Sequence, residues 1–304
     1  MSSTLRRFAL RHLRKMRFLP SKLYVHIHYE YFTGNKLDLA SPKDFNEKIE
    51  WYKVFYRPQI LNILVDKHKV RDFVKEKIGE QYLNDQIGVY DKGEDIPFNE
   101  LPDKFVLKAN HTNNCNLIVT DKSTLDRNKV VNLSNKWLRK SQYHRRGQEW
   151  AYKDVQPKLV IEKYLEQPGR KSLVDYKFYC FNGQAKFIDV HVDRDDDHQQ
   201  GCFDLDFNLL PFGKSTTYAS ISNDIEKPTN LDEMVRIANV LSQNLPFVRV
   251  DLYAIAGKTI FGELTFYPSD ARKAFYPPEY NRVVGDYFIL PELNQKKEVI
   301  TTFN

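Results

Sequence analysis

The feature that most constrains the fold of this chain is residues 247–268, FVRVDLYAIAGKTIFGELTFYP. Apolar and polar residues alternate over residues 248–253, which is the period-two pattern of a half-buried strand. A second alternating run follows a short turn at residues 256–258. The stretch therefore predicts a β-hairpin in which Asp251 and Glu263 lie across from each other.

If both carboxylates of this hairpin face a cleft, a cation is needed to offset their repulsion. Mg2+ suits hard oxygen ligands and usually binds through one or two carboxylates together with substrate phosphates. The alternative is a solvated hairpin, because an antiparallel sheet often carries polar residues on an outer face. This stretch alone leaves both interpretations open.

Composition sets the class of protein. With 304 residues, 41% of them apolar, the chain can bury the cores of two lobes. No run approaches the ~18 apolar residues of a membrane span, and arginines interrupt the N-terminal apolar runs, so no secretory signal is expected. Cys115, Cys180 and Cys202 are too widely spaced to indicate a zinc site or a disulfide framework. A reducing, cytoplasmic setting is expected.

The positive charge is concentrated at the N-terminus. Residues 1–22 carry seven basic residues and no acidic residue, which leaves about −1 of the net +6 for the rest of the chain. The body is therefore not expected to bind nucleic acid. Five apolar residues of this segment recur at helical spacing, namely Leu5, Phe8, Ala9, Leu13 and Met16. Such a helix is typical of peripheral contact with an anionic membrane and equally of a helix docked on the body.

A second candidate for phosphate binding is a strand, loop and strand. Residues 105–108 form a short apolar run that ends in Lys108, and residues 109–116 are polar and small before a strand resumes at 117. Backbone N–H groups of such a loop can cover anionic oxygens while the lysine supplies charge. The loop lacks the glycine that favours close backbone approach.

Other elements follow from the same patterns. Strands are expected at residues 159–165, 174–181 and 185–192, the last two joined by an Asn-Gly turn. Helices are expected at residues 41–56, 60–78 and 230–244, and the segment from residue 271 is expected to be irregular.

The order of these motifs resembles the ATP-grasp superfamily. FVLKANHTNN is followed by EKYL, then DYK, then RVD with ELT twelve residues later. The segments SPKDFNEKIEWYK, DYKFYCFNG and FGELTFYP are similar in sequence to the TupA-like branch of this superfamily, which is named after teichuronopeptide biosynthesis. The resemblance covers roughly residues 40–290.

This resemblance implies an α+β ATP-grasp fold, in which two α+β lobes clamp ATP, with a basic, helical N-terminal extension. The implied divisions are residues 1–58 for the N-terminal region, 59–165 for the first lobe and 166–304 for the second. ATP and Mg2+, as two ions, are the implied cofactors.

The resemblance also implies the site residues. Those that match ATP-binding positions are two phosphate lysines, the covering loop, the adenine hinge and the ribose acid: Lys67, Lys108, His111, Asn113, Glu162, Lys163, Leu165 and Asp175. The implied Mg2+ ligands are Asp251, Glu263 and Thr265, and the implied catalytic residues are Arg249, Lys177 and Arg194. The chain departs from the usual pattern at Thr265, where the superfamily usually has asparagine, and in its glycine-poor loop.

The implied activity is that of an ATP-dependent ligase, which activates a carboxylate as an acyl-phosphate before an amine attacks. The TupA-like branch implies cell-surface polysaccharide and capsule biosynthesis, with an amino acid or amine joined to a uronic-acid-containing glycan, a lipid-linked saccharide or an acidic peptide extension. The expected location is cytoplasmic, with peripheral contact between residues 1–22 and the inner face of the plasma membrane.

Two alternatives remain open from the sequence. Asp193 to Asp197 and Asp204-Leu205-Asp206 contain the D-x-D pattern of metal-dependent glycosyltransferases, although a short acidic tripeptide is more often a surface turn. The other alternative is a non-catalytic ATP-grasp module, which Thr265 and the glycine-poor loop favour.

Overall fold

The hairpin predicted at residues 247–268 forms one edge of the larger of two sheets. The computed structural model describes residues 3–16, 18–145, 147–193, 197–214, 219–221, 225–294, 296 and 298–303. Strand β9 (Phe247–Ile255) pairs with β10 (Lys258–Thr265), and Asp251 stands directly opposite Glu263. An irregularity of register between Phe261 and Glu263 interrupts the ladder at Gly262. The predicted juxtaposition of the two acids is confirmed.

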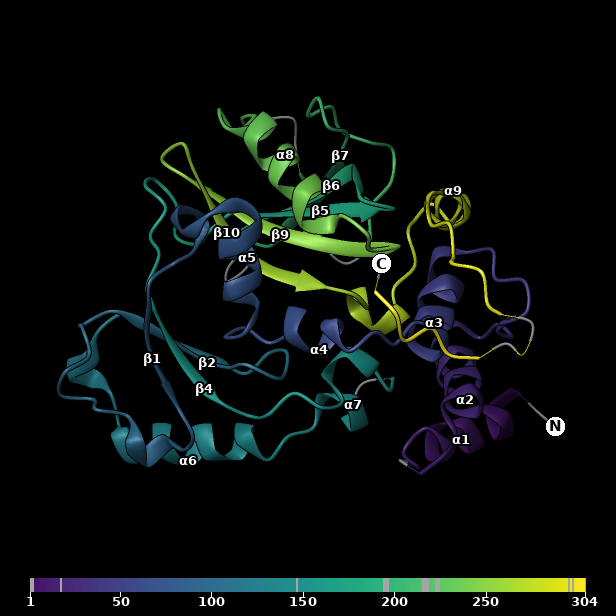
Figure 1. Cartoon of the computed structure of the whole chain (residues 1–304), viewed down its shortest axis with the longest axis horizontal. Helices are drawn as coiled ribbons and strands as arrows, with labels where there is room; N and C mark the ends of the chain where they lie inside the picture. The colour runs from purple at the N-terminus through teal and green to yellow at the C-terminus, as the bar shows by residue number, and fades with distance from the viewer. Residues whose placement is uncertain are drawn as a thin grey trace.

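The larger sheet has the strand order β10-β9-β5-β6-β7-β8 in the described part of the chain. Its other strands are β5 (Asp175–Phe181), β6 (Gln184–Val192), β7 (Gln199–Phe203) and β8 (Ala219–Ser220). Helix α8 (Leu231–Ser242) lies across β5, β6 and β9 and buries the predicted apolar stripe of Met234, Ile237, Ala238 and Leu241 (Figure 1). This half of the molecule is therefore a helix packed on a sheet whose strands pair antiparallel, except for the parallel pair β7–β8.

The smaller sheet has the order β1-β4-β2-β3. Its strands are β1 (Gln86–Tyr90), β4 (Leu159–Lys163), β2 (Phe105–Ala109) and β3 (Asn116–Val119), and α6 (Arg127–Leu138) covers one face (Figure 1). Its core is separate from the larger core and takes its buried residues from Ile96 to Ile161. Two lobes with separate cores are the arrangement that the motif order predicts.

The helix expected at residues 60–78 is two helices, α4 (Ile60–Leu64) and α5 (Val70–Ile78). Buried Asp66 ends the first one, because its Oδ1 accepts hydrogen bonds from the backbone N–H groups of His68, at 2.9 Å, and Lys69, at 3.2 Å. Such side-chain bonds compete with helical ones. Apolar residues of α4 and α5 pack in the core of the larger sheet.

Two other sequence expectations need correction. Helix α3 (Phe45–Phe55) begins after Asp44, which forms a capping box with Glu47, and not at Ser41. The C-terminal part is not irregular throughout, because α9 (Glu279–Tyr287) begins directly after Pro278, a residue that helix N-termini tolerate.

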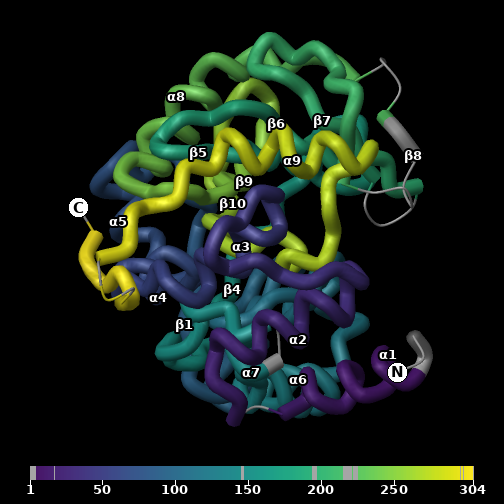
Figure 2. The backbone as a smooth tube through the Cα atoms, turned by 90° about the vertical axis from the view of Figure 1, so that its right-hand side faces the viewer, coloured from purple at the N-terminus to yellow at the C-terminus, as the bar shows by residue number. Residues whose placement is uncertain are grey.

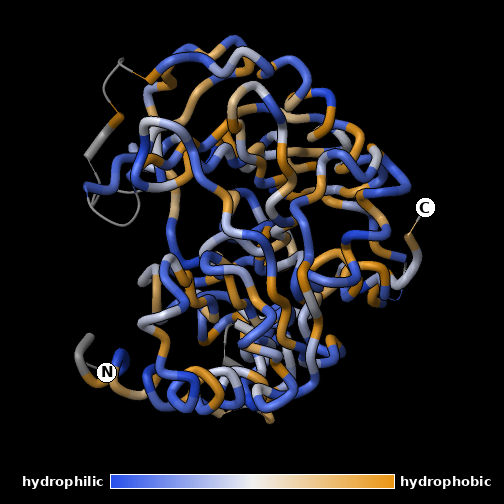
Figure 3. Tube along the Cα trace, turned by 90° about the vertical axis from the view of Figure 1, so that its left-hand side faces the viewer, coloured by the Kyte–Doolittle hydropathy of each residue, from blue (hydrophilic) through white to orange (hydrophobic). Residues whose placement is uncertain are grey.

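The N-terminal helices stand beside both lobes. Helices α1 (Ser3–Leu13) and α2 (Ser21–Thr33) pack on each other, and α2 and α3 run in front of the region between the two sheets (Figure 2). Figure 3 shows the opposite side of the molecule, where hydrophilic and hydrophobic residues alternate along the lower edge; Figure 1 places α6 there, a helix that buries Val130, Ser134 and Trp137 and exposes its other face. None of the helices in the described ranges is long and apolar enough to cross a membrane.

Candidate active site

Two lysines line the cavities beside the β9–β10 hairpin, Lys108 from the smaller sheet and Lys67 from the turn between α4 and α5. Lys67 lies in the turn that Asp66 forms between α4 and α5, and its Nζ donates to the Thr112 carbonyl oxygen at 3.1 Å. Lys108 alternates outward on β2, between buried Leu107 and Ala109, and its Nζ lies 2.6 Å from a carboxylate oxygen of Glu162. Both lysines line the same two cavities.

Charged side chains around these cavities shift one another's pKa values. Burial lowers the pKa of Lys67, the carboxylate of Glu263 opposes that shift, and the ammonium of Lys108 adds to it. Burial would raise the pKa of Glu263, but Lys67, Arg249 and Lys177 together hold it below its ordinary value. The site is therefore a cluster of cations around carboxylates, which suits the binding of a polyphosphate together with a metal ion.

Asp251 is the most enclosed carboxylate of the hairpin, with 3% of its surface exposed. The guanidinium of Arg249 donates to both of its oxygens, at 2.7 Å and 2.6 Å, and Nζ of Lys177 donates at 3.0 Å. Lys177 also lies 3.4 Å from the carboxylate of Asp175. These residues come from adjacent strands β5 and β9, which hold them side by side.

Thr265 joins this cluster from β10. Its hydroxyl donates to Glu263 Oε1 at 3.3 Å and accepts from Arg249 Nη2 at 3.0 Å. The Glu263 side chain is 39% exposed, so its carboxylate opens toward the cavity while Asp251 lies behind it. Two carboxylates and one hydroxyl are hard oxygen donors, and they fit Mg2+, which commonly completes its shell with phosphate oxygens and water. No cluster of three or more histidine, cysteine, aspartate or glutamate side chains suited to a metal occurs within the described ranges.

The first cavity has a volume of about 790 Å3 and lies along β4 and the segment after it. Its lining includes the expected hinge residues Glu162, Lys163 and Leu165, together with Asp175. The backbone of Lys163 is held in place, since its N–H donates to Asp85 O at 2.9 Å and its carbonyl oxygen accepts from Asn84 Nδ2 at 2.8 Å.

The second cavity, of about 500 Å3, continues from the first. Lys67, Lys108, Glu162 and Asp175 line both. Of the other expected site residues, the second cavity takes Asn113, Lys177, Arg249, Asp251, Glu263 and Thr265. The structure thus brings most of the sequence-predicted residues to two connected cavities.

Among the described residues, one expected residue, His111, does not join this group. His111 is buried with its ring nitrogens 3.0 Å from the Lys140 carbonyl oxygen and 3.1 Å from Asn110 Oδ1, so it holds the base of the loop and lines neither cavity. Burial lowers the pKa of His111, and the Lys140 carbonyl opposes that shift. Arg194 lies outside the described residues, as do Asp195 and Asp196 of the first acidic motif. In the second motif, Asp204 accepts the N–H of Asp206 at 3.0 Å, as a surface turn does.

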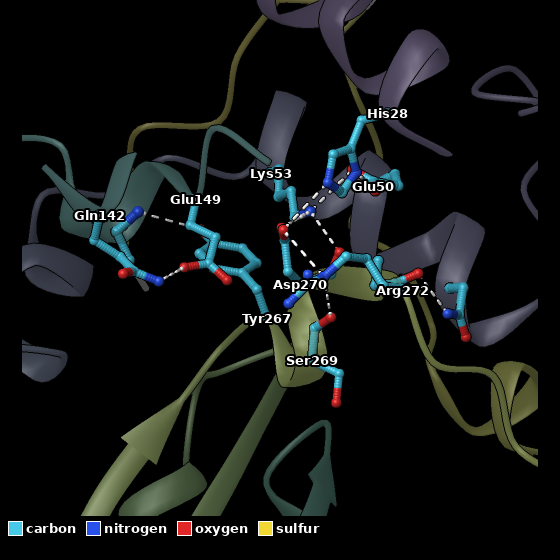
Figure 4. Close-up of polar contacts among 12 residues, drawn as sticks. His28, Glu50, Lys53, Gln142, Glu149, Tyr267, Ser269, Asp270 and Arg272 are labelled. Atoms are coloured by element: carbon cyan, nitrogen blue, oxygen red, sulfur yellow. Dashed lines mark hydrogen bonds and ion pairs between the residues drawn. The ribbon is translucent and has the colours of Figure 1, made fainter. Parts of the chain in front are cut away.

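Sequence reasoning missed a buried ionic network behind the second cavity (Figure 4). Asp270 lies 2.8 Å from Lys53 Nζ and 3.2 Å from His28 Nε2, and His28 Nδ1 lies 3.2 Å from Glu50. Burial opposes ionisation of Asp270, yet Lys53 and His28 hold its pKa well below the ordinary value. Residues Ser269, Asp270 and Ala271 all have positive φ, near 55°, a conformation that costs energy in residues other than glycine.

This network ties helices α2 and α3 to the turn that forms one wall of the second cavity. The same wall holds the pair Gln142–Glu149, joined by a hydrogen bond of 2.7 Å (Figure 4). No periodicity marks these residues in the sequence, because they come together only through tertiary packing.

A protein-family model described as TupA-like ATPgrasp matches residues 47–289. This span agrees with the residues over which the motifs resemble that branch. No curated protein is significantly similar to the chain in sequence.

Solved structures that match the chain include ATP-grasp ligases at low identity. The D-alanine–D-alanine ligase of Bacillus anthracis is 19% identical, with a TM-score of 0.43, over 73% of this chain and 64% of that one. The Helicobacter pylori D-alanine–D-alanine ligase is 11% identical, with a TM-score of 0.43, over 82% and 67%. The ATP-grasp ligase PsnB, complexed with a minimal precursor, is 13% identical, with a TM-score of 0.38, over 68% and 54%. The chain thus spans less than two thirds of the Bacillus ligase and of PsnB.

Proposed function

We propose that this chain, which belongs to the TupA-like ATP-grasp family, is an ATP-dependent ligase that joins a carboxylate to an amine. The γ-phosphoryl group of ATP would pass to the carboxylate, giving an acyl-phosphate and ADP. The amine would then attack the acyl carbon, phosphate would leave, and the amine nitrogen would lose a proton.

One observation carries this proposal. Lys108 of the smaller sheet and Lys67 of the turn between α4 and α5 line two connected cavities together with residues of the β9–β10 hairpin, whose paired carboxylates are Asp251 and Glu263. A nucleotide in the first cavity would extend its phosphates to the point where these charges meet. Phosphoryl transfer needs positioning and charge neutralisation more than covalent help from the protein.

The roles of individual residues follow from their places. Lys67 and Lys108 would bind phosphate oxygens, and the segment from Glu162 to Leu165 would hold the adenine. Asp175 would accept the ribose hydroxyls, and Lys177 would offset charge on the transferred group. Two N–H groups of Arg249 already donate to Asp251, so only the remaining N–H groups of its guanidinium would donate to the acyl-phosphate.

Asp251, Glu263 and Thr265 are the residues that would hold Mg2+, as one or two ions. The bound ion would neutralise charge on the phosphates during transfer. Within the protein, Arg249 and Lys177 hold the Asp251 carboxylate in one orientation through their hydrogen bonds.

The substrates follow from the TupA-like branch. We propose an amino acid or amine as one substrate and a uronic-acid-containing glycan, lipid-linked saccharide or acidic peptide as the other, in the synthesis of a cell-surface polysaccharide. The setting would be cytoplasmic, with residues 1–22 touching the anionic inner face of the plasma membrane.

The test is phosphate release from ATP and Mg2+ across a panel of uronic acids and amino acids, with hydroxylamine added to trap the acyl-phosphate as a hydroxamate. Release that needs both substrates, and a hydroxamate that needs only the carboxylate, is the expected result. Asp251→Asn should abolish both. Turnover of UDP-sugars without ATP would overturn the proposal in favour of a glycosyltransferase, and ATP binding without turnover on the panel would favour a non-catalytic module.

A further inference from the structure

Two residues that line the second cavity each carry a buried polar group that has no hydrogen-bond partner among the residues that the structure describes. These groups are Nζ of Lys214 and the hydroxyl of Tyr179. Lys214 is 6% exposed and Tyr179 is fully buried. A buried polar atom without a partner is costly, so such atoms in a cavity wall point to a ligand that supplies the missing bonds.

Lys214 is held at the cavity by its neighbours. Gly213, directly before it, exchanges backbone hydrogen bonds with Tyr276 at 3.0 Å and 2.8 Å, which fixes the chain at this point. The ammonium lies 5.0 Å from the ring centroids of Phe45 and Phe275 and 5.4 Å from that of Tyr179. Three rings stabilise a cation through their faces, but they donate and accept no conventional hydrogen bond.

Tyr179 stands beside this ammonium on β5. Its ring stacks on Phe187 with centroids 4.6 Å apart, so it has little freedom to swing its hydroxyl elsewhere. Both residues line the second cavity, and together they hold two hydrogen-bond donors, one charged, that no described residue satisfies. That pair matches the two oxygens of a carboxylate.

The acids near Lys214 are already occupied. Asp189 accepts from Gln200 Nε2 at 2.7 Å and lies 3.3 Å from His191, and Asp251 is paired with Arg249. Among the described residues, these two acids are therefore taken up by other partners, and a neutral ligand would leave the charge of Lys214 uncompensated.

We propose that Lys214 and Tyr179 bind a carboxylate of the amino-acid substrate that takes no part in the reaction. This inference rests on the proposed ligase function and adds to it the class of amine substrate, an amino acid recognised by its own carboxylate. Anchored there, the amino group would remain free to reach the acyl-phosphate in the same cavity.

The first test compares three variants. Lys214→Met and Tyr179→Phe should each raise the KM for the amino acid at least tenfold, leave the KM for ATP unchanged, and leave the melting temperature unchanged or higher, because each removes an unpaired buried group. Tyr52→Phe is the matched control, since Tyr52 is also buried but its hydroxyl donates to Phe247 O at 3.2 Å. It should lower the melting temperature without changing the KM for the amino acid.

The second test uses the charge of Lys214. Burial lowers its pKa to about 7, Asp189 opposes that shift, and Arg249 and Lys273 add to it, with the Cys202 thiol also near. A bound carboxylate favours the charged form, so calorimetric titration of amino acid at pH 8, in buffers of different ionisation enthalpy, should show proton uptake. Lys214→Arg should bind without uptake, because arginine stays charged.

The outcomes separate the two proposals. If the wild-type protein releases phosphate but accepts the amides glycinamide and L-alaninamide as well as the parent amino acids, this inference fails and the ligase function stands. The inference also fails if Lys214→Met leaves the KM for the amino acid unchanged. Acetate should compete with the amino acid for this site, and equal competition by inorganic phosphate would contradict a site for a carboxylate. If no carboxylate and amine pair supports turnover, the ligase function itself fails.

Discussion

At the scale of single residues, Thr265 is the position where the chain departs from its superfamily. We expect Thr265→Ala to weaken the apparent affinity for Mg2+ about tenfold, the lower end of losses seen when groups that orient ligands are removed. The reason is that its hydroxyl bridges Glu263 and Arg249. Thr265→Asn should retain most of the affinity. Mg2+ dependence of phosphate release measures both.

A matched control for this prediction lies on the same strand. Thr259 is buried on β10, and its hydroxyl donates to Glu233 at 2.6 Å, but it lines neither cavity. Thr259→Ala should lower stability and leave the Mg2+ dependence unchanged. Equal Mg2+ profiles for Thr265→Ala and the wild-type protein would show that the hydroxyl has no part in the metal site.

His28 gives a prediction of pH dependence. Burial lowers its pKa, but hydrogen bonds and charge from Asp270 and Glu50 outweigh burial and raise it above the ordinary 6.5. A raised pKa in the folded state means that stability from this group is complete below the unfolded pKa and is lost as pH rises through the folded pKa. Between pH 6 and pH 9 the free energy of unfolding in urea should therefore fall more for the wild-type protein than for His28→Gln.

His26 provides the control on the same helix. It is exposed on α2, and His26→Gln should reproduce the wild-type dependence on pH. A His28→Gln protein with the wild-type slope would mean that the buried network holds no proton on the histidine.

At the scale of elements, Asp66 decides where Lys67 points. Asp66→Ala removes two hydrogen bonds to backbone N–H groups, and losing a cap of this kind costs about 1 kcal/mol. The turn between α4 and α5 should then lose its shape, so the KM for ATP should rise as Lys67 moves. Asp72→Ala, at an exposed position of α5, should change neither the melting temperature nor the KM. An unchanged KM in Asp66→Ala would mean that the turn does not position the lysine.

The same turn shows what the sequence could and could not predict. Strands β9 and β10 were predicted closely, because successive side chains of a strand point to opposite faces of the sheet, so the alternation of apolar and polar residues is visible in the sequence. The break at Asp66 was missed, since residues 60–78 have helical composition and the aspartate acts through its side chain. The approach of Lys214 to Tyr179 is further from prediction, because the two residues are 35 positions apart and strands β6 and β7 lie between them in the chain.

At the scale of the whole molecule, the order of motifs was more informative than any one of them. It predicted the ATP-grasp fold and the TupA-like family, and the family match confirms both. The division into residues 1–58, 59–165 and 166–304 stays a prediction. The N-terminal helices contribute to the second cavity. His28 of α2 and Lys53 of α3 form ion pairs with Asp270, which lies in the wall of that cavity.

Helix α1 leads to the last prediction. Arg6 of α1 pairs with Glu30, and Arg14 just after the helix stacks on Tyr31, so the helix is docked. Leu5 and Phe8 of α1 are nevertheless 55% and 60% exposed, and Phe18, beyond the helix, is 82% exposed. Apolar side chains beside basic ones suit an anionic bilayer surface, where each basic residue contributes roughly 1 kcal/mol.

We expect the protein to sediment with vesicles of phosphatidylserine and phosphatidylcholine, less so in high salt and not with phosphatidylcholine alone. The double variant Phe8→Asp, Phe18→Asp should lose this binding, because it removes apolar contact and adds negative charge. Ile289→Asp is the control, since Ile289 is 68% exposed but follows α9, at the other end of the chain. If the double variant still sediments, or if Ile289→Asp abolishes binding equally, the exposed face of α1 is not a membrane surface. The docking of α1 on α2 is then its whole role.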